Sequence, residues 1–235
     1  MATFNLWHLF PLTEERKLRT FLHGGLWCAE LNSIITSLGD VEETQPYGTF
    51  VSCWHRSEGD PTLIAWTIFG GDGAGIAIRG SSSYLKSLAD KVCRNWVRGR
   101  FGEVRYLSPT EHVVDVAFEV RSIHQSESEM RVALGLSDGS IQDDGLRRSQ
   151  VRAQCPIRQS DRNITKKVEG LTLIEEKMGE DALVLPIDPK TLFEEVVFGP
   201  HVSAPERERI QRLVTDSGVH CPFRALPQAG DSVAT

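Results

Sequence analysis

The sequence predicts an α+β domain built on a bent mixed β-sheet with flanking helices. Short apolar segments of high strand preference recur along the chain, and they end at proline, glycine or aspartate residues. A smaller number of segments carry apolar residues at three-and-four spacing, which is the period of an amphipathic helix. With 235 residues, the chain is long enough to bury a sizeable core as one domain. We therefore expect a single domain over residues 1–226 and a disordered tail over 227–235.

Composition narrows the classes of protein to which the chain can belong. Its net charge is −6 at pH 7 and its pI is about 5.7, so a general role on nucleic acid is not indicated. No apolar run approaches the ~20 residues of a membrane span, so no membrane partner is expected. The five cysteines lie far apart without metal-ligand spacing, which predicts no metal site. Unpaired cysteines of this kind are typical of a cytoplasmic protein, where thiols stay reduced.

The first third of the chain alternates strand and helix patterns. Strands are expected over 4–10, 26–31, 49–55 and 75–79, and helices over 13–22 and 63–69. Thr13 is the expected N-cap of the first helix because two glutamates follow it, and the helix is expected to end at Gly24. The glycine-rich segment 70–75 follows a helix and precedes a strand. That order differs from the order of a phosphate-binding loop, so a tight turn is the better interpretation.

The remaining two thirds begin with the clearest helical pattern, an apolar stripe from Leu85 to Val97. The long polar segment 137–180 is expected to be either functional or mobile and to contain short strands. The last helix starts at a capping box formed by Ser203 and Glu206. Further strands are expected over 103–107, 170–174, 182–187 and 191–198, and a further helix over 113–120.

One predicted strand carries charged residues along a single face. Glu127, Glu129 and Arg131 alternate with other residues, so their side chains point to the same side. Charges are costly to bury without partners, so this strand is expected either at a solvated edge or along a polar cleft. The two carboxylates would lie about 7 Å apart, at ~3.3 Å per residue, and could divide the work of holding a hydroxyl and stabilising a cation. Weak surface ion pairs are the alternative interpretation.

Other reactive residue types give weaker signals. The chain has no Gly-x-Ser-x-Gly turn of the kind that carries a nucleophilic serine. Cys53 stands two residues before His55 and could be a nucleophile, although a buried cysteine on an aromatic strand is the commoner outcome. His8 lies in the middle of the first strand beside Trp7, where a hydrogen-bonded core histidine is the simpler interpretation.

Several segments, taken in order, resemble a bacterial family known as domain of unknown function 2971. The matching segments are Trp7-His8, Gly25–Cys28, Val51–Trp54, Ala65-Trp66, Gly75–Ile78, Glu103–Tyr106, Glu127–Arg131, Leu185–Asp188 and Glu195–Pro200. The family's Phe-Asn-Asp-Pro turn is replaced here by the residues Glu30 to Ile34, of which only Asn32 can correspond. No activity is established for the family, so the resemblance implies a fold more than a function.

The order of three polar residues is also similar to that of ADP-ribosyltransferases. Those enzymes place a His or Arg on a first strand, a Ser or Tyr on a second, and a Glu, often as Glu-x-Glu, on a later one. In this chain His8, Ser52 and Glu129 follow the same order. The similarity implies that NAD is the substrate. His8 would form a hydrogen bond with the adenosine ribose, and Ser52 would help to order the pocket of the nicotinamide ribose.

The same similarity implies roles for four further side chains. Glu129 would hold the ribose 2′-hydroxyl and stabilise an oxocarbenium-like transition state, while Glu127 would steer the acceptor. Trp54 or Trp66 would pack against the nicotinamide. Apart from this similarity, Arg131 shares the strand face of the two glutamates and would hold one carboxylate or an anionic ligand.

Two functions of different classes follow from these patterns. The first is an NAD-dependent ADP-ribosyltransferase or NAD glycohydrolase-like enzyme that binds a nucleotide and has an unidentified acceptor. The second is a non-catalytic binding module, in which the basic helix face from Lys86 to Arg100 meets an acidic partner. A pocket lined jointly by His8, Ser52 and Glu129 favours the enzyme, whereas separation of the three by the sheet core would count decisively against it.

Overall fold

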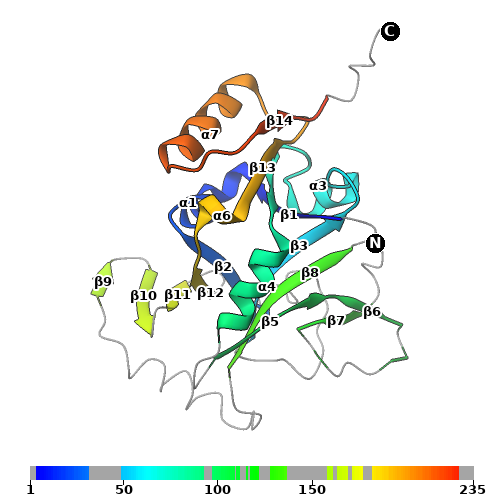
Figure 1. Cartoon of the computed structure of the whole chain (residues 1–235), viewed down its shortest axis with the longest axis vertical. Coiled ribbons are helices and arrows are strands. Elements are labelled where there is room, and N and C mark those ends of the chain that lie inside the picture. The colour runs from blue at the N-terminus through cyan, green and yellow to red at the C-terminus, as the bar shows by residue number, and fades with distance from the viewer. Residues whose placement is uncertain are drawn as a thin grey trace.

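The computed structural model describes residues 4–31, 49–92, 97–108, 110–111, 115, 117–121, 128–136, 158–160, 163–168, 171–176 and 182–227. Within these ranges, five α-helices flank a large mixed sheet (Figure 1). The predicted α+β class with a mixed sheet is therefore confirmed. Glu127 and the predicted tail from residue 228 lie outside the described residues.

The elements fall into three groups along the chain. The first comprises β1 (Asn5–Pro11), a 3₁₀ turn (Leu12–Glu14), α1 (Glu15–Leu22), β2 (Gly25–Glu30), β3 (Thr49–Ser57), α3 (Leu63–Phe69) and β4 (Gly75–Gly80). The second comprises α4 (Ser82–Lys91), β5 (Val97–Glu103), β6 (Arg105–Leu107), β7 (Glu119–Arg121) and β8 (Glu129–Leu136). The third comprises β9 (Arg158–Ser160), β10 (Asn163–Val168), β11 (Leu171–Glu176), β12 (Ala182–Pro186), α6 (Pro189–Leu192), β13 (Phe193–Phe198), α7 (Ala204–Asp216) and β14 (Phe223–Ala225).

The main sheet runs in the order β14-β13-β4-β1-β3-β2-β12-β11-β10-β9, and β8 joins it along β3 with β5 beyond. Its described pairs are antiparallel except for β13 with β14, which is parallel. The strand that carries Glu129 and Arg131 is thus flanked on both sides, by β3 and by β5. The expectation of a solvated edge is wrong for this strand.

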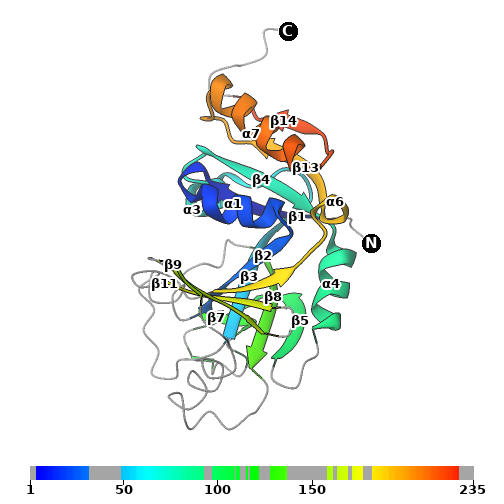
Figure 2. The ribbon, with the colours of Figure 1, turned by 90° about the vertical axis from the view of Figure 1, so that its left-hand side faces the viewer.

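The sheet splits beside β3, and the split determines where a site can form. One edge of β3 pairs with β8 over residues 49–55. The other edge pairs with β1 only over 55–57 and with β2 only over 50–51, so residues 52–54 have no ladder partner there among the described strands. In Figure 2 the part of the sheet with β1 and β4 lies above the part with β2, β3 and β8, and α1 connects the two.

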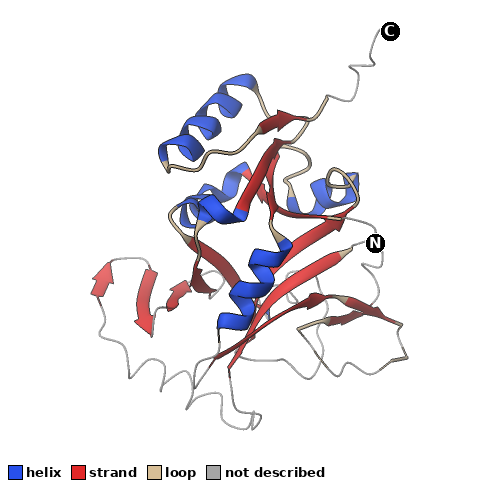
Figure 3. Cartoon of the chain, viewed as in Figure 1, coloured by secondary structure: helices blue, strands red, loops and turns tan. Residues whose placement is uncertain are grey.

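The two largest apolar clusters lie on opposite faces of the sheet. The larger cluster lies on the face where α1, α4 and α7 pack, which we call the inner face, and it includes Phe21, Trp54, Leu85, Val132 and Ile210. The smaller cluster lies on the opposite, outer face under α3 and consists of Trp7, Leu9, Ala65, Trp66, Ala77 and Val197. Figure 3 shows the described helices, in blue, against the strands of this sheet.

The predicted helix over 85–97 is too long. α4 ends at Lys91 and Val97 begins β5, because β5 pairs with β8 along its whole length and this pairing overrides the helical period. Gly99 allows the close approach of β5 to α4, since a Cβ there would collide with the carbonyl oxygen of Ala89. The basic residues from Lys86 to Arg100 therefore do not share one helix face.

Other local differences have similar causes. The 3₁₀ turn precedes α1, so Glu14 rather than Thr13 is its N-cap, and it makes no side-chain cap bond. The described part of segment 113–120 ends in β7 and holds no helix. The predicted strand over 191–198 begins two residues late, because α6 ends at Leu192. The capping box of Ser203 and Glu206 is confirmed at the start of α7.

Candidate pocket where β1 and β2 diverge

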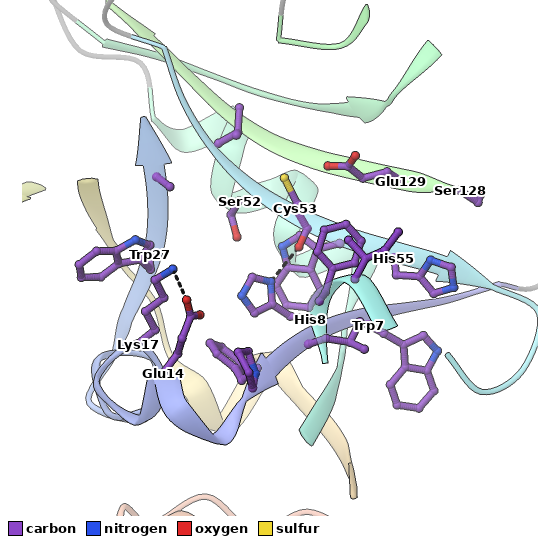
Figure 4. A pocket seen from close by; sticks show the side chains of 18 residues that line it. Trp7, His8, Glu14, Lys17, Trp27, Ser52, Cys53, His55, Ser128 and Glu129 are labelled. Carbon is purple, nitrogen blue, oxygen red and sulfur yellow. Dashed lines mark hydrogen bonds and ion pairs between the residues drawn. The ribbon is translucent and has the colours of Figure 1, made fainter. Parts of the chain in front are cut away.

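A cavity of about 330 Å³ lies where β1 and β2 diverge beside β3 (Figure 4). Its lining comes from both parts of the split sheet, from α1 and α3, and from the start of β8. Four residues expected from sequence line it, namely His8, Ser52, Trp54 and Glu129. The volume is at the lower end of the range for small-molecule sites.

Ser52 and Glu129 reach this cavity from opposite faces of the β3–β8 pair. Ser52 is in register with Val132, whereas Glu129 is in register with His55. Because successive strand residues point to opposite faces, Ser52 lies on the inner face and Glu129 on the outer face. In Figure 4 the hydroxyl of Ser52 and the thiol of Cys53 point to opposite sides of β3. Both faces contribute to one cavity because β3 lacks a neighbour along residues 52–54.

His8 occupies the gap in the ladder. Its Nδ1 lies 2.8 Å from the carbonyl oxygen of Cys53, and a carbonyl only accepts, so Nδ1 carries the proton and donates. The imidazole packs against Phe10, Phe21 and Trp54 at centroid distances of 4.5, 5.5 and 5.0 Å. Desolvation among these rings lowers the pKa of His8 to about 4. His8 is therefore neutral at pH 7, and its Nε2 is available as an acceptor.

Glu129 is held in place by Arg131. Its two carboxylate oxygens accept from Arg131 Nε at 2.7 Å and Nη2 at 3.2 Å, and Arg131 Nη1 donates to the carbonyl of Ala117 at 3.1 Å. Glu129 is 6% exposed and Arg131 is 5% exposed. A surface ion pair is therefore the wrong interpretation of this strand. Arg131 does not line the cavity; it fixes the carboxylate that does.

Two residues next to this pair have no charge at neutral pH. Desolvation lowers the pKa of His55, which faces Glu129 across the strands and accepts a long bond, 3.4 Å, from the backbone N–H of Thr62. Burial, with the neighbouring Glu129 carboxylate, raises the pKa of the Cys53 thiol well above its usual value. Cys53 is consequently a thiol rather than a thiolate, which argues against its interpretation as a nucleophile.

The lining also holds polar atoms that have no hydrogen-bond partner in the described part of the chain. These atoms are Trp27 Nε1, Ser52 Oγ and Trp54 Nε1, and all three residues are at least 95% buried. Trp7, which also lines the cavity, differs because its Nε1 donates to Ser57 Oγ and to the carbonyl of Gly59. Buried polar groups nearly always have a hydrogen-bond partner. Three unpaired polar atoms around one cavity therefore indicate a place for a ligand or ordered water.

The sequence missed Trp27 and His55 as lining residues and placed Trp66 incorrectly. Trp66 packs in the outer-face cluster and does not line the cavity. In the sequence, Trp27 and His55 have no feature that distinguishes them from other strand residues. They border the cavity because of the register of β2 with β3 and of β3 with β8. Within the described ranges, no group of three His, Cys, Asp or Glu side chains is arranged to hold a metal ion.

No protein-family model, curated protein or solved structure matches the chain. Both resemblances noted in the sequence therefore stay predictions. Among the described helices, none is long and apolar enough to cross a membrane.

Proposed function

We propose that the chain binds NAD in this pocket and cleaves its nicotinamide–ribose bond, as an ADP-ribosyltransferase or an NAD glycohydrolase does. The single observation that carries the proposal is that His8, Ser52, Trp54 and Glu129, which come from three separate strands, line one cavity. The cavity of about 330 Å³ suits one half of the dinucleotide, so the other half would extend beyond it.

In the proposed reaction, the glycosidic C–N bond breaks and its electron pair leaves with the nicotinamide. Positive charge then develops on the ribose, next to a carboxylate that is already fixed and desolvated. A preorganised charge of this kind stabilises a transition state without further reorganisation. Water or an acceptor group adds to the ribose carbon and loses its proton to solvent water, which completes hydrolysis or transfer.

The side chains on the other walls would orient the substrate. The neutral Nε2 of His8 can accept from a ribose hydroxyl, because Nδ1 is occupied by the Cys53 carbonyl. The hydroxyl of Ser52 has no partner among the described residues and can both donate and accept. His55, which lies across from Glu129, accepts from the Thr62 N–H through Nε2, so its Nδ1 carries the proton and can donate to a substrate oxygen.

A non-catalytic ligand-binding module is the second candidate, and the Glu129–Arg131 pair favours it. Both carboxylate oxygens of Glu129 already accept hydrogen bonds from the Arg131 guanidinium. The pair can therefore form a rigid polar wall of the pocket and take no part in a reaction. In this alternative, NAD or another small molecule binds in the same cavity and leaves unchanged. Binding and turnover must therefore be measured separately.

The test is incubation with NAD labelled in the nicotinamide ring, with release of nicotinamide as the readout. Glu129→Gln alone leaves the buried Arg131 guanidinium without a counter-charge. The informative variant is therefore the double change Glu129→Gln with Arg131→Gln, which removes both charges together. Glu103→Gln is the matched control, because Glu103 is an acid on the neighbouring strand β5 that pairs with Arg56 outside the pocket.

The proposal predicts release by the wild-type chain and by Glu103→Gln, and at least a 100-fold loss in the folded double variant. A folded double variant that cleaves NAD at the wild-type rate would overturn the role of Glu129. Binding of NAD without release, across protein, nucleic-acid and water acceptors, would decide for the binding module.

A further inference from the structure

Trp27 has a hydrogen-bond donor for which the described protein supplies no acceptor. Its indole sits on the outer face of β2 with Ala29, Ala182 and Val184, under the guanidinium of Arg16 at 5.0 Å from the ring centroid. The side chain is 5% exposed and lines the cavity, and its Nε1 has no partner among the described residues. A buried N–H without an acceptor is costly, so an oxygen acceptor brought by a ligand or by water would stabilise this position.

The other indoles put this observation in context. Trp7 pairs its Nε1 twice, so the fold can satisfy an indole where nothing else is required. Trp54 is fully buried and has an unpaired Nε1, and it lines the same cavity. Trp66 also has an unpaired, buried Nε1, but it lies outside the cavity.

Tryptophan donates and cannot accept through its ring nitrogen. Trp27 and Trp54 therefore contribute two donors and no acceptor, and they lie on opposite faces of the part of the sheet that contains β2 and β3. A ligand that satisfies both must present oxygen acceptors in two directions. Carbonyl or hydroxyl oxygens meet this need.

We infer that Trp27 is a ligand-recognition residue, whose indole N–H donates to an oxygen acceptor of the bound molecule. The inference deepens the proposed function, because the carboxamide and the ribose of NAD both carry such oxygens. It does not depend on cleavage, since recognition by Trp27 is equally required of a binding module. Trp27 is thus a specificity residue on β2 that the order of the sequence motifs does not disclose.

The experiment compares Trp27→Phe with Trp66→Phe. Both changes keep an aromatic ring, remove similar volume and delete a buried, unpaired N–H, but only Trp27 borders the cavity. NAD affinity is measured by calorimetry on each folded variant. We expect about 10-fold weaker binding for Trp27→Phe, since a hydrogen bond contributes about that factor, and a change within 2-fold for Trp66→Phe.

A second readout keeps the inference testable if NAD proves not to be the ligand. Indole N–H signals of the ¹⁵N-labelled protein are assigned through the tryptophan variants and followed while acetamide, a small neutral oxygen acceptor, is titrated. We expect the chemical shift of the Trp27 indole N–H to change with acetamide concentration until it saturates, and that of Trp66 to remain unchanged. If acetamide shifts Trp27 but NAD does not bind, the NAD proposal fails and this inference stands. If NAD binds equally to wild type and Trp27→Phe, or if neither compound moves the Trp27 signal, the inference is overturned.

Discussion

Glu129 and Arg131 stand two residues apart on β8 and form a two-point ion pair that is almost wholly buried beside the pocket. Burying two charges costs several kcal/mol of solvation, which only close pairing offsets. The guanidinium also donates to the carbonyl of Ala117, so the pair ties β8 to the turn before β7. The pair is therefore a structural feature as well as a wall of the candidate site.

The first prediction concerns the stability of this pair. Arg131→Met should lower the free energy of unfolding by about 3–5 kcal/mol, because it leaves the Glu129 carboxylate buried without a counter-charge. The double variant Glu129→Gln with Arg131→Met should recover most of this loss, since no charge remains. Urea unfolding at pH 7 measures both. A cost below about 1 kcal/mol for the single variant would mean that water reaches the carboxylate freely.

The second prediction concerns the pH dependence of stability through His8. Its pKa in the folded protein is about 4, below the ordinary value of 6.5, so the unfolded chain binds the proton first as the pH falls. Stability from this source is complete above pH 6.5, declines between pH 6.5 and 4, and levels off below. The total is of order 3 kcal/mol, at 1.36 kcal/mol per pKa unit.

The matched variant for this prediction is His8→Asn, whose amide can replace the Nδ1–H bond to the Cys53 carbonyl and does not titrate. The difference in unfolding free energy between wild type and variant should shrink as the pH is lowered from 7 to 4, because only the wild type loses this contribution. A pH-independent difference would place the imidazole in contact with bulk water. NMR titration of the His8 ring provides the direct check.

The third prediction tests the contact between α4 and β5. Gly99→Ala should destabilise the fold by about 1–3 kcal/mol, because the added methyl group collides with the Ala89 carbonyl and must displace α4 or β5. Gly135→Ala is the control on the paired strand, where a Cβ meets no atom within 4 Å. It should be neutral or stabilise by up to about 1 kcal/mol. Thermal unfolding of both variants measures the two effects. Equal unfolding midpoints for Gly99→Ala and Gly135→Ala would contradict the close contact between Gly99 and Ala89.

Elements with strong local signals could be predicted from the sequence alone. The aromatic and β-branched residues from Thr49 to His55 form β3, and α3 has the predicted bounds of 63–69. The capping box at Ser203 is present because both of its bonds are local. The end of α4 could not be predicted in this way, since Val97 leaves the helical pattern only because β8 lies nearby to pair with it.

The candidate site shows the same division. The motif order selected His8, Ser52 and Glu129, and the structure places all three around one cavity. The split between β1 and β2 could not be predicted, because the alternation of side chains describes one strand at a time. At this split, residues from both faces of the sheet border the same cavity. The buried pairing of Glu129 with Arg131, opposite His55 on β3 and held to the Ala117 carbonyl, likewise depends on long-range contacts that no local pattern of charges discloses.

The fourth prediction uses Cys53 as a reporter of the pocket. Because burial and the Glu129 carboxylate raise the pKa of its thiol, Cys53 should react with iodoacetamide far more slowly at pH 8 than the same residue in the urea-unfolded chain. Cys53 lines the cavity, so a ligand held there should slow the reaction further. Peptide mass spectrometry follows alkylation of Cys53 with and without saturating NAD, and Cys221, which does not line the cavity, serves as the internal control. Selective protection of Cys53 places the ligand beside β3. Protection of neither or both cysteines would place NAD elsewhere, whatever its affinity.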